Sequence, residues 1–254
     1  MHSEVIGDSL IILKRNLIRF RRQPEMLIGY TVQPIMFVLL FVYVFGGSIN
    51  TGMDYVDFLI PGILCQNITF GGAITAVGLV DDLHKGLIDR FRSLPMARSA
   101  VLAGRTLADV VVNFLGVVII ILVGYIVGFN FSTSVPEVAY GIFLLLLFGY
   151  AFSWIFALIG LYSTTAENAQ QFGFIVIFPI TFISSAFVPV DSMPAALEAF
   201  ANINPFTITV DAMRSLFVGT PAGDSVWQAT AWSVGLIAVF APLAVLKYRR
   251  VSAR

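Results

Sequence analysis

The side chains best suited to specific polar contacts lie in one hydrophilic stretch, Asp81 to Arg105. This stretch holds five of the fifteen Lys and Arg residues of the chain, namely Lys85, Arg90, Arg92, Arg98 and Arg105. Their chemistry is the donation of charge-assisted hydrogen bonds to carboxylates, which suits recognition of an acidic surface. Cationic groups are costly to place in hydrocarbon, so we expect the stretch to stay in water beside a membrane.

A short amphipathic helix is predicted inside this stretch. Its apolar residues recur at helical spacing and leave the charged residues on the other faces: Leu83, Leu87, Phe91 and Leu94. Pro95 has no N–H to continue a helix, so we expect the helix to end near Leu94. Because a plain loop would be enough to connect the flanking apolar segments, a two-faced helix indicates contact with another molecule.

The residue patterns of common enzyme sites are not found in the sequence. Its two histidines, His2 and His84, are too few for a His-rich metal site or for a Ser-His-Asp set within apolar segments. No G-x-x-x-x-G-K-[ST] phosphate loop occurs, so we expect no bound nucleotide of that kind and no cofactor in this chain. The net charge of zero gives no indication of a nucleic-acid partner, and the single Cys65 excludes an intramolecular disulfide.

Composition predicts an all-α integral membrane protein. The 254 residues are 58% hydrophobic and only 12% charged, with a mean hydropathy of +0.89, whereas soluble domains carry about 25% charged residues. Lipid offers the backbone no hydrogen-bond partner, so apolar segments of about 20 residues are expected to cross as helices. Six such segments follow one another in a single domain, residues 1–254: Met26–Phe45, Val56–Val80, Thr106–Gly128, Val138–Tyr162, Phe172–Val188 and Val226–Leu246.

The positions of the basic residues orient these segments. Five Lys and Arg residues precede the first segment, five lie in Asp81–Arg105 and four follow the last segment, which leaves Arg214 alone on the other side. Cytoplasmic loops carry the excess of Lys and Arg in membrane proteins. We therefore expect a multi-pass protein of the cell membrane, inner or plasma, with both termini and the Asp81–Arg105 stretch in the cytoplasm.

Two further segments are predicted to lie at the membrane surfaces. Residues 1–22 form an amphipathic helix too charged for a signal peptide, which binds lipid headgroups and is also able to pack on a cytoplasmic partner. The outer segment 189–225 contains two short helices, Ala195–Ala201 and Thr207–Phe217, joined at Asn204-Pro205. This pair either lies flat on the membrane or enters it and returns, which requires its broken backbone to be buried in protein.

A few polar and aromatic residues inside the spans are candidates for a translocation path: Gln66, Asn67, Phe70, Asn113, Phe152 and Phe156. Hydrogen bonding between helices is the alternative interpretation for the amides. Asp109 follows Arg105 by four residues, and this spacing predicts an interfacial ion pair between them.

The chain resembles the permease subunits of type-2 ABC exporters, especially the daunorubicin-resistance-like drug and lipid exporters. The resemblance covers nearly the whole chain, and three runs carry it: Lys85-Gly86 followed by Asp89 to Pro95, Ala166 to Gln171 before the fifth span, and Asn204 to Thr207 with Asp211 and Arg214. Members of that family often have Glu and Thr where this chain has Asp89 and Leu87.

The resemblance implies an assembly of two permeases, identical or different, with two cytoplasmic ATP-binding subunits that hold ATP and Mg²⁺. It further implies that the helix up to Leu94 docks on the ATPase, through Lys85, Gly86, Asp89, Arg90, Arg92, Ser93 and Leu94. It identifies the outer segment as a re-entrant pair of helices, marked by Asn204, Pro205, Asp211 and Arg214.

The expected function is therefore export of an apolar or amphipathic drug or lipid by alternating access, without ATPase activity in this chain. Within the same family, a polysaccharide or lipid-linked glycan is the alternative cargo. An ion-coupled secondary transporter would normally need buried ionisable groups near the bilayer centre, and a non-transporting scaffold would need no conformational cycle. Transport that depends on ATP distinguishes these three classes.

The charge distribution makes a prediction about topology. Reporter fusions placed after Gly86 and after Arg254 should report the cytoplasm, and a fusion after Asp191 should report the outside, because fourteen basic residues hold their side of the chain in the cytoplasm. Reporter activity in whole cells measures this. A cytoplasmic signal from the Asp191 fusion would contradict the model of six spans.

Overall fold

The computed structural model describes residues 14, 18, 24–84, 98–221 and 223–251 of the chain. Two predicted features lie almost wholly outside these residues. They are the N-terminal amphipathic helix and the helix ending near Leu94, which carries all seven residues implied to contact an ATPase: Lys85, Gly86, Asp89, Arg90, Arg92, Ser93 and Leu94. Both features therefore remain predictions.

The all-α prediction is confirmed for the part of the chain that is described, in which every regular element is a helix. The longer elements are α2 (Pro24–Leu40), α3 (Tyr55–His84), α5 (Arg98–Ile126), α6 (Val135–Tyr162), α7 (Ala166–Phe182) and α10 (Ser225–Val251). A π-helical turn, η1 (Phe41–Phe45), extends α2, and a 3-10 turn, η2 (Val190–Ser192), precedes α8 (Ala195–Ile203) and α9 (Pro205–Val218).

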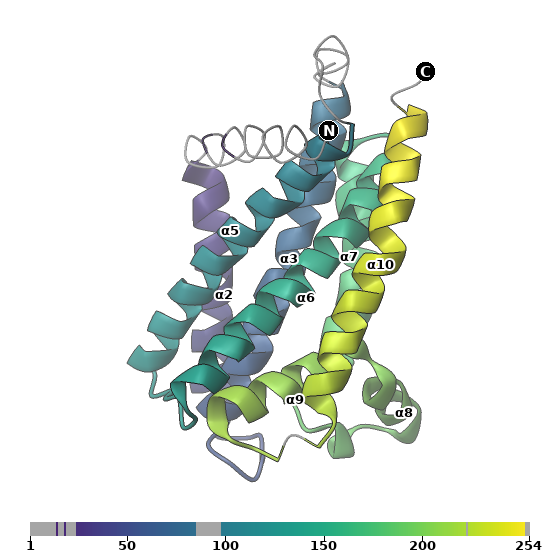
Figure 1. Cartoon of the computed structure of the whole chain (residues 1–254). Helices are drawn as coiled ribbons and strands as arrows, with labels where there is room; N and C mark the ends of the chain where they lie inside the picture. Colours follow the sequence, from purple (N-terminus) through teal and green to yellow (C-terminus); the bar gives the residue numbers. More distant parts are fainter. Residues whose placement is uncertain (1–13, 15–17, 19–23, 85–97, 222, 252–254) are drawn as a thin grey trace.

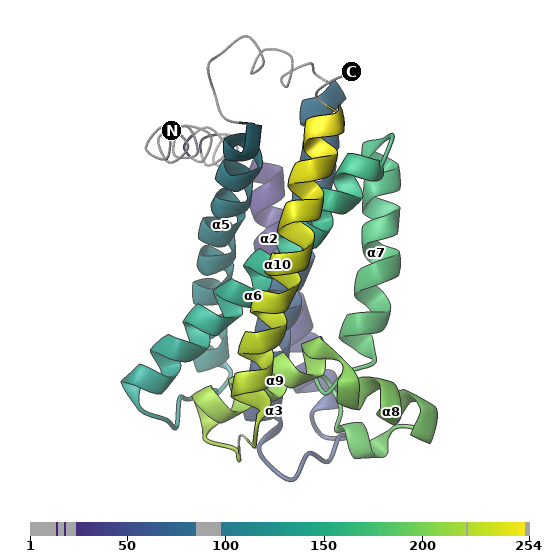
Figure 2. The same cartoon turned by 45° about the vertical axis from the view of Figure 1, so that its right-hand side comes forward.

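The long helices run side by side, and the short α8 and α9 lie at one end of the bundle (Figures 1 and 2). The start of α2, the end of α3, the start of α5 and the end of α10 gather at the opposite end. Arg249 and Arg250 belong to the last turn of α10, whereas Arg214 belongs to α9. In the described helices, Arg214 thus lies at the opposite end of the bundle from Arg249 and Arg250, as the distribution of Lys and Arg along the sequence predicted.

Among the described residues, four helices are long and apolar enough to cross a membrane, within α3, α5, α6 and α10: Tyr55–Asp82, Gly104–Ile126, Val135–Tyr162 and Ser225–Arg250. The continuous α2–η1 element contains a shorter apolar part, Thr31–Phe45, and α7 has 17 residues. By length and composition, four spans are supported directly, and the first and fifth of the six predicted spans correspond to these two shorter helices.

The helices flanking the hydrophilic stretch are longer than predicted. α3 continues through Asp81 to His84, and α5 already begins at Arg98, so both ends of the predicted polar loop are helical. A charged side chain at a helix end does not force the backbone out of the helix, because it can reach water or pair with a neighbouring helix. Asp82 of α3 pairs in this way with Arg105 of the neighbouring α5.

The limits of the fifth predicted segment, Phe172–Val188, differ from those of the helix. The run Ala166 to Gln171 forms the first turns of α7, because the Thr165 side chain accepts a hydrogen bond from the Asn168 backbone N–H at 3.1 Å and caps the helix. The helix then ends at Phe182, and residues 183–189 continue without helical structure. The length of the apolar run therefore predicted neither the first nor the last residue of α7.

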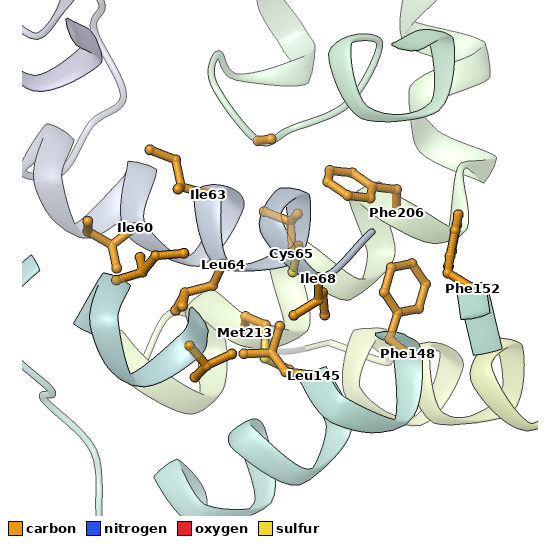
Figure 3. Close-up of a cluster of buried hydrophobic side chains, with 14 of the residues drawn as sticks. Ile60, Ile63, Leu64, Cys65, Ile68, Leu145, Phe148, Phe152, Phe206 and Met213 are labelled. Carbon is orange, nitrogen blue, oxygen red and sulfur yellow. The ribbon is translucent and has the colours of Figure 1, made fainter. Parts of the chain in front are cut away.

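The core is centred on α3, the most buried of the four long spans. Ile60, Leu64 and Ile68 of α3 face Leu145, Phe148 and Phe152 of α6, with Phe206 and Met213 of α9 on the same cluster (Figure 3). Gly160 permits close contact between α6 and α3, since a Cβ at that position would lie 2.8 Å from the carbonyl oxygen of Ala76. α3 is therefore the helix on which α2, α5, α6, α7 and α9 pack, whereas α10 packs on α6 and α9.

Candidate functional site

Arg214 of α9 is a buried cation that several hydrogen bonds hold in place. Its Nε donates to the Phe58 carbonyl at 3.0 Å, its Nη1 donates to Asp211 Oδ1 at 2.8 Å, and its Nη2 donates to the carbonyls of Ser185 and Ala186. The guanidinium also lies 3.6 Å from the centre of the Phe58 ring, in the geometry of a cation–π contact. One side chain thus connects α9 to α3 and to the segment after α7.

The segment after α7 explains why such a residue is needed. Ser184, Ser185, Ala186 and Phe187 are buried but not helical, so their backbone groups lack the partners that a helix would provide. Besides Arg214, the Asn204 Nδ2 donates to the carbonyls of Ile180 at 2.7 Å and Ile183 at 3.0 Å. Two side chains from one short segment therefore satisfy four carbonyls at the end of α7.

The position of Asn204 follows from local chemistry. Its side-chain Oδ1 accepts from the Phe206 N–H at 2.9 Å, which caps the start of α9. Pro205 occupies the first position of α9, where the missing N–H is not required. The same asparagine is the C-cap of α8 and directly follows its last residue, Ile203. A single Asn-Pro pair thus ends one helix, starts the next and leaves its amide nitrogen free to bind the end of α7.

Further contacts hold this outer region against the bundle. Gly62 allows α3 to approach the buried segment, since a Cβ there would lie 2.8 Å from the Ala186 Cα. The Tyr55 hydroxyl donates to the Phe187 carbonyl at 3.2 Å. In the connection between α5 and α6, the Thr133 hydroxyl donates to the Leu216 carbonyl at 2.5 Å. α9 therefore contacts α3, the segment after α7 and the connection between α5 and α6.

The charge of this cluster is partly balanced. Burial lowers the pKa of Arg214 to about 10, while the Asp211 carboxylate opposes this shift, so the guanidinium is protonated at neutral pH. Asp211 Oδ1 also accepts from the Ser185 hydroxyl at 2.8 Å. The Asp211 side chain is 46% exposed, whereas that of Arg214 is 6% exposed. The cluster therefore contains a buried, protonated guanidinium beside a carboxylate that is partly exposed.

A cavity of about 330 Å³ lies between α2, α3 and α7. Most of its wall is apolar, from residues such as Pro34, Phe37, Ile63, Phe70, Ala73 and Phe174, and four amide side chains also line it: Gln33, Gln66, Asn67 and Gln170. This combination of an apolar wall with a few polar groups is typical of sites for small molecules.

Two of these amides are buried without a partner. Gln66 is 6% exposed and Asn67 is 8% exposed, and neither Gln66 Nε2 nor Asn67 Nδ2 has a hydrogen-bond partner in the described part of the chain. An unmade hydrogen bond at a buried donor costs about 1–3 kcal/mol. Gln66 and Asn67 therefore carry unsatisfied donors at the wall of the cavity.

The six residues predicted for the translocation path do not share one place. Gln66, Asn67 and Phe70 line the cavity. Phe152 instead packs on Phe148, with ring centres 4.8 Å apart, and Phe156 is fully buried in the core. Asn113 is buried beside Gly149 of α6, where a Cβ would lie 3.1 Å from its Nδ2. The four residues predicted for the outer pair, Asn204, Pro205, Asp211 and Arg214, do come together.

Sequence reasoning missed an aromatic ladder that extends from the cavity toward the outer region. Neighbouring ring centres lie 4.5 to 6.1 Å apart along Phe70, Phe174, Phe178, Phe182, Phe187 and Phe41. The signal was available in α7, where Phe174, Phe178 and Phe182 recur every four residues, a spacing that places them on one helix face.

Comparison with known proteins gives consistent matches. The model of the ABC-2 type transporter family matches residues 9–218. The daunorubicin resistance ABC transporter permease protein DrrB1 of Streptomyces coeruleorubidus is 33% identical, over 98% of this chain and 88% of that protein. A probable doxorubicin resistance ABC transporter permease protein, DrrC of Mycobacterium tuberculosis, is 25% identical over 97% and 90%. A putative transport permease, ycf38 of Cyanophora paradoxa, is 28% identical over 84% and 74%.

The outer cluster makes a prediction about stability. Arg214→Ala leaves the non-helical carbonyls of Ser185 and Ala186 without their side-chain donor. Each costs about 1–3 kcal/mol, so we expect the free energy of unfolding to fall by at least about 2 kcal/mol. The stability of Arg214→Lys should lie between that of the unmodified protein and that of Arg214→Ala, since one ammonium group cannot reproduce the planar set of donors of a guanidinium. The melting temperature of the detergent-solubilised protein measures this. Arg250→Ala, on an exposed residue of α10, is the control, and equal melting temperatures for the two alanine variants would contradict the role given to Arg214.

Proposed function

The chain belongs to the ABC-2 type transporter family, and we propose that it is the transmembrane permease of an ATP-driven exporter for an apolar or amphipathic compound. The match to a drug-resistance permease along nearly the whole chain carries this proposal. The cavity between α2, α3 and α7 supports it, because this is a place where a small molecule fits against a mostly apolar wall.

The motor of this exporter is a separate subunit. Two cytoplasmic ATP-binding subunits, which hold ATP and Mg²⁺, act on two permeases, and this chain contributes no ATP hydrolysis of its own. The absence of a phosphate-loop motif from the sequence supports that division of labour. The docking helix up to Leu94 is the proposed contact with the ATPase.

The proposed topology has six spans: α2 with η1, α3, α5, α6, α7 and α10. Both termini lie in the cytoplasm in this topology, since fourteen of the fifteen Lys and Arg residues fall on one side of the six spans. In this topology α8 and α9 form the outer re-entrant pair. The carbonyls that Asn204 and Arg214 satisfy support re-entry, because non-helical backbone within a membrane must find its partners in protein.

The proposed transport path passes through the cavity. Cargo binds with its apolar surface on Phe37, Phe70 and Phe174 and with oxygen acceptors on the Gln66 and Asn67 amides. This wall favours a drug or lipid over a glycan, whose many hydroxyl groups would need more partners than four amides offer. ATP-driven closure of the ATPase pair pushes the docking helix, and the permeases then rock to open the path outward.

The proposed function is tested in proteoliposomes that contain the permease with its co-purified ATPase. With daunorubicin as the probe, we expect uptake that requires ATP. Arg90→Glu and Gly86→Pro should abolish this transport without lowering the amount of permease in the membrane, because the first reverses a charge at the ATPase contact and the second disrupts the docking helix. Losing one charge-assisted contact costs about 1.5–3 kcal/mol.

Arg254→Glu in the tail is the control and should transport as the unmodified protein does. Full transport in both docking-helix variants would show that Asp81–Arg105 is only a linker. ATP hydrolysis by the isolated, pure chain would overturn the assignment as a permease, and transport driven by an ion gradient without ATP would indicate a secondary carrier.

The cavity makes a separate prediction about cargo. Gln66→Leu and Asn67→Leu keep the volume but remove the unpaired donors, so we expect an unchanged or higher melting temperature. The same variants should raise the KM for daunorubicin about tenfold, the equivalent of about 1.4 kcal/mol. Initial rates of ATP-dependent uptake measure this. Gln228→Leu, the same change on an exposed residue of α10, should leave the KM unchanged, and an unchanged KM in all three variants would exclude these amides from the path.

A further inference from the structure

Asp82 of α3 and Arg105 of α5 join the two helices on either side of the docking segment, by which we mean residues 85–97 with the proposed docking helix. Arg105 Nη1 of α5 lies 2.7 Å from Asp82 Oδ2 of α3, and the two side chains are only 11% and 9% exposed. Residues 83–104 separate them in sequence, so the pair closes the base of the segment that connects α3 to α5. The spacing of Arg105 and Asp109 within α5 gave no indication of this contact between helices.

The guanidinium of Arg105 also lies against the backbone of α3. A Cβ at Gly78 would collide with Arg105 Nη2 and would lie 3.1 Å from its Cζ. Gly78 precedes Asp82 by four residues, which places both on one face of α3. Arg105 therefore spans about one turn of the neighbouring helix, and glycine at position 78 provides the room for it.

A second contact lies one turn farther into the bundle. The Thr75 hydroxyl of α3 donates to Asp109 Oδ2 of α5 at 2.5 Å, and Asp109 follows Arg105 by four residues. Beside these contacts, Leu79 and Leu102 pack in a buried cluster with residues of α6 and α10: Trp154, Ala157, Leu161, Ala244 and Tyr248. The ends of α3 and α5 nearest the docking segment are thus fixed to each other by polar and apolar contacts.

We propose that the Asp82–Arg105 pair makes α3 and α5 a single lever, so that a displacement of the docking segment moves the cavity wall. α3 is continuous from Asp82 to Gln66 and Asn67, a distance of about 24 Å along a helix. A push on one helix alone would be absorbed by sliding between α3 and α5. With the pair in place, the push reaches the amides that line the cavity.

Stability alone does not account for the pair. Removing two charges from water is costly, and apolar residues of similar volume often replace a buried ion pair without loss. An ion pair does fix the relative position of two helices, because only one arrangement satisfies both charges. Asp82 and Arg105 are therefore positioning residues. This inference rests on the proposed function, since it assigns the pair a part in coupling ATP hydrolysis to transport.

The test measures coupling separately from assembly, in the reconstituted complex with daunorubicin as the probe. The readouts are membrane abundance, ATPase rate, and molecules transported per ATP hydrolysed. Asp82→Asn and Arg105→Gln should each lower the transport ratio about tenfold while ATP hydrolysis continues. The charge-swapped double variant, Asp82→Arg with Arg105→Asp, should restore the ratio to within about threefold of the unmodified complex, as expected for two residues that act through each other.

Gly78→Ala provides a second variant that keeps both charges. Its Cβ displaces the Arg105 guanidinium, so it should also lower the transport ratio, and it remains informative if the charge variants are not inserted into the membrane. Gly235→Ala in α10 is the matched control, because a Cβ at that position meets nothing within 4 Å. This control should keep the ratio of the unmodified complex.

The outcomes separate the inference from the proposed function. If the unmodified complex shows no ATP-dependent transport, the proposed function fails. If the unmodified complex transports but the single variants keep a normal transport ratio, the lever hypothesis is wrong and the proposed function stands. The same conclusion holds if the single variants lose only membrane abundance. A lowered ratio that the charge swap does not restore also overturns the lever, because the two residues then do not act as a pair.

Discussion

The outer half of the structure depends on one constraint, which is that buried backbone carbonyls must receive hydrogen bonds even where a helix has ended. α7 ends at Phe182, and the chain then continues through buried residues. Asn204 and Arg214 supply the missing donors from a neighbouring pair of short helices. Because Arg214 also binds the Phe58 carbonyl, satisfying α7 fixes α9 on α3 at the same time. The positions of α3, α7 and α9 are therefore determined together.

α3 is held by charged residues near both of its ends. Arg214 binds the carbonyl of Phe58, and Arg105 binds the carboxylate of Asp82. The cavity amides Gln66 and Asn67 lie between these two contacts. Directional polar contacts therefore fix α3 near both of its ends, and the donors without a partner lie between them.

Local patterns in the sequence predicted the helical class, the segregation of basic residues and the helix boundary at Asn204-Pro205. They gave no indication of contacts that depend on another helix. The spacing along α5 relates Arg105 to Asp109, but it did not indicate that Arg105 also pairs with Asp82 of α3. The burial of Phe152 against Phe148 was not predicted, because a helix that is apolar all round gives no indication of which face is buried. The apolar run Phe172–Val188 likewise concealed the end of α7, which depends on donors from α9.

The cavity and the aromatic ladder have complementary physical properties. Gln66 and Asn67 provide directional donors at one place, whereas the exposed rings of Phe178 and Phe182 offer contact that depends little on orientation. An exporter that bound its cargo tightly along the whole route could not release it, since each strong contact would have to be broken in turn. Amides that select the cargo at the cavity, followed by aromatic contacts that hold it weakly, would separate recognition from movement. The spacing of Phe174, Phe178 and Phe182 along one face of α7 provides such a surface between the cavity and the residues that α9 fixes.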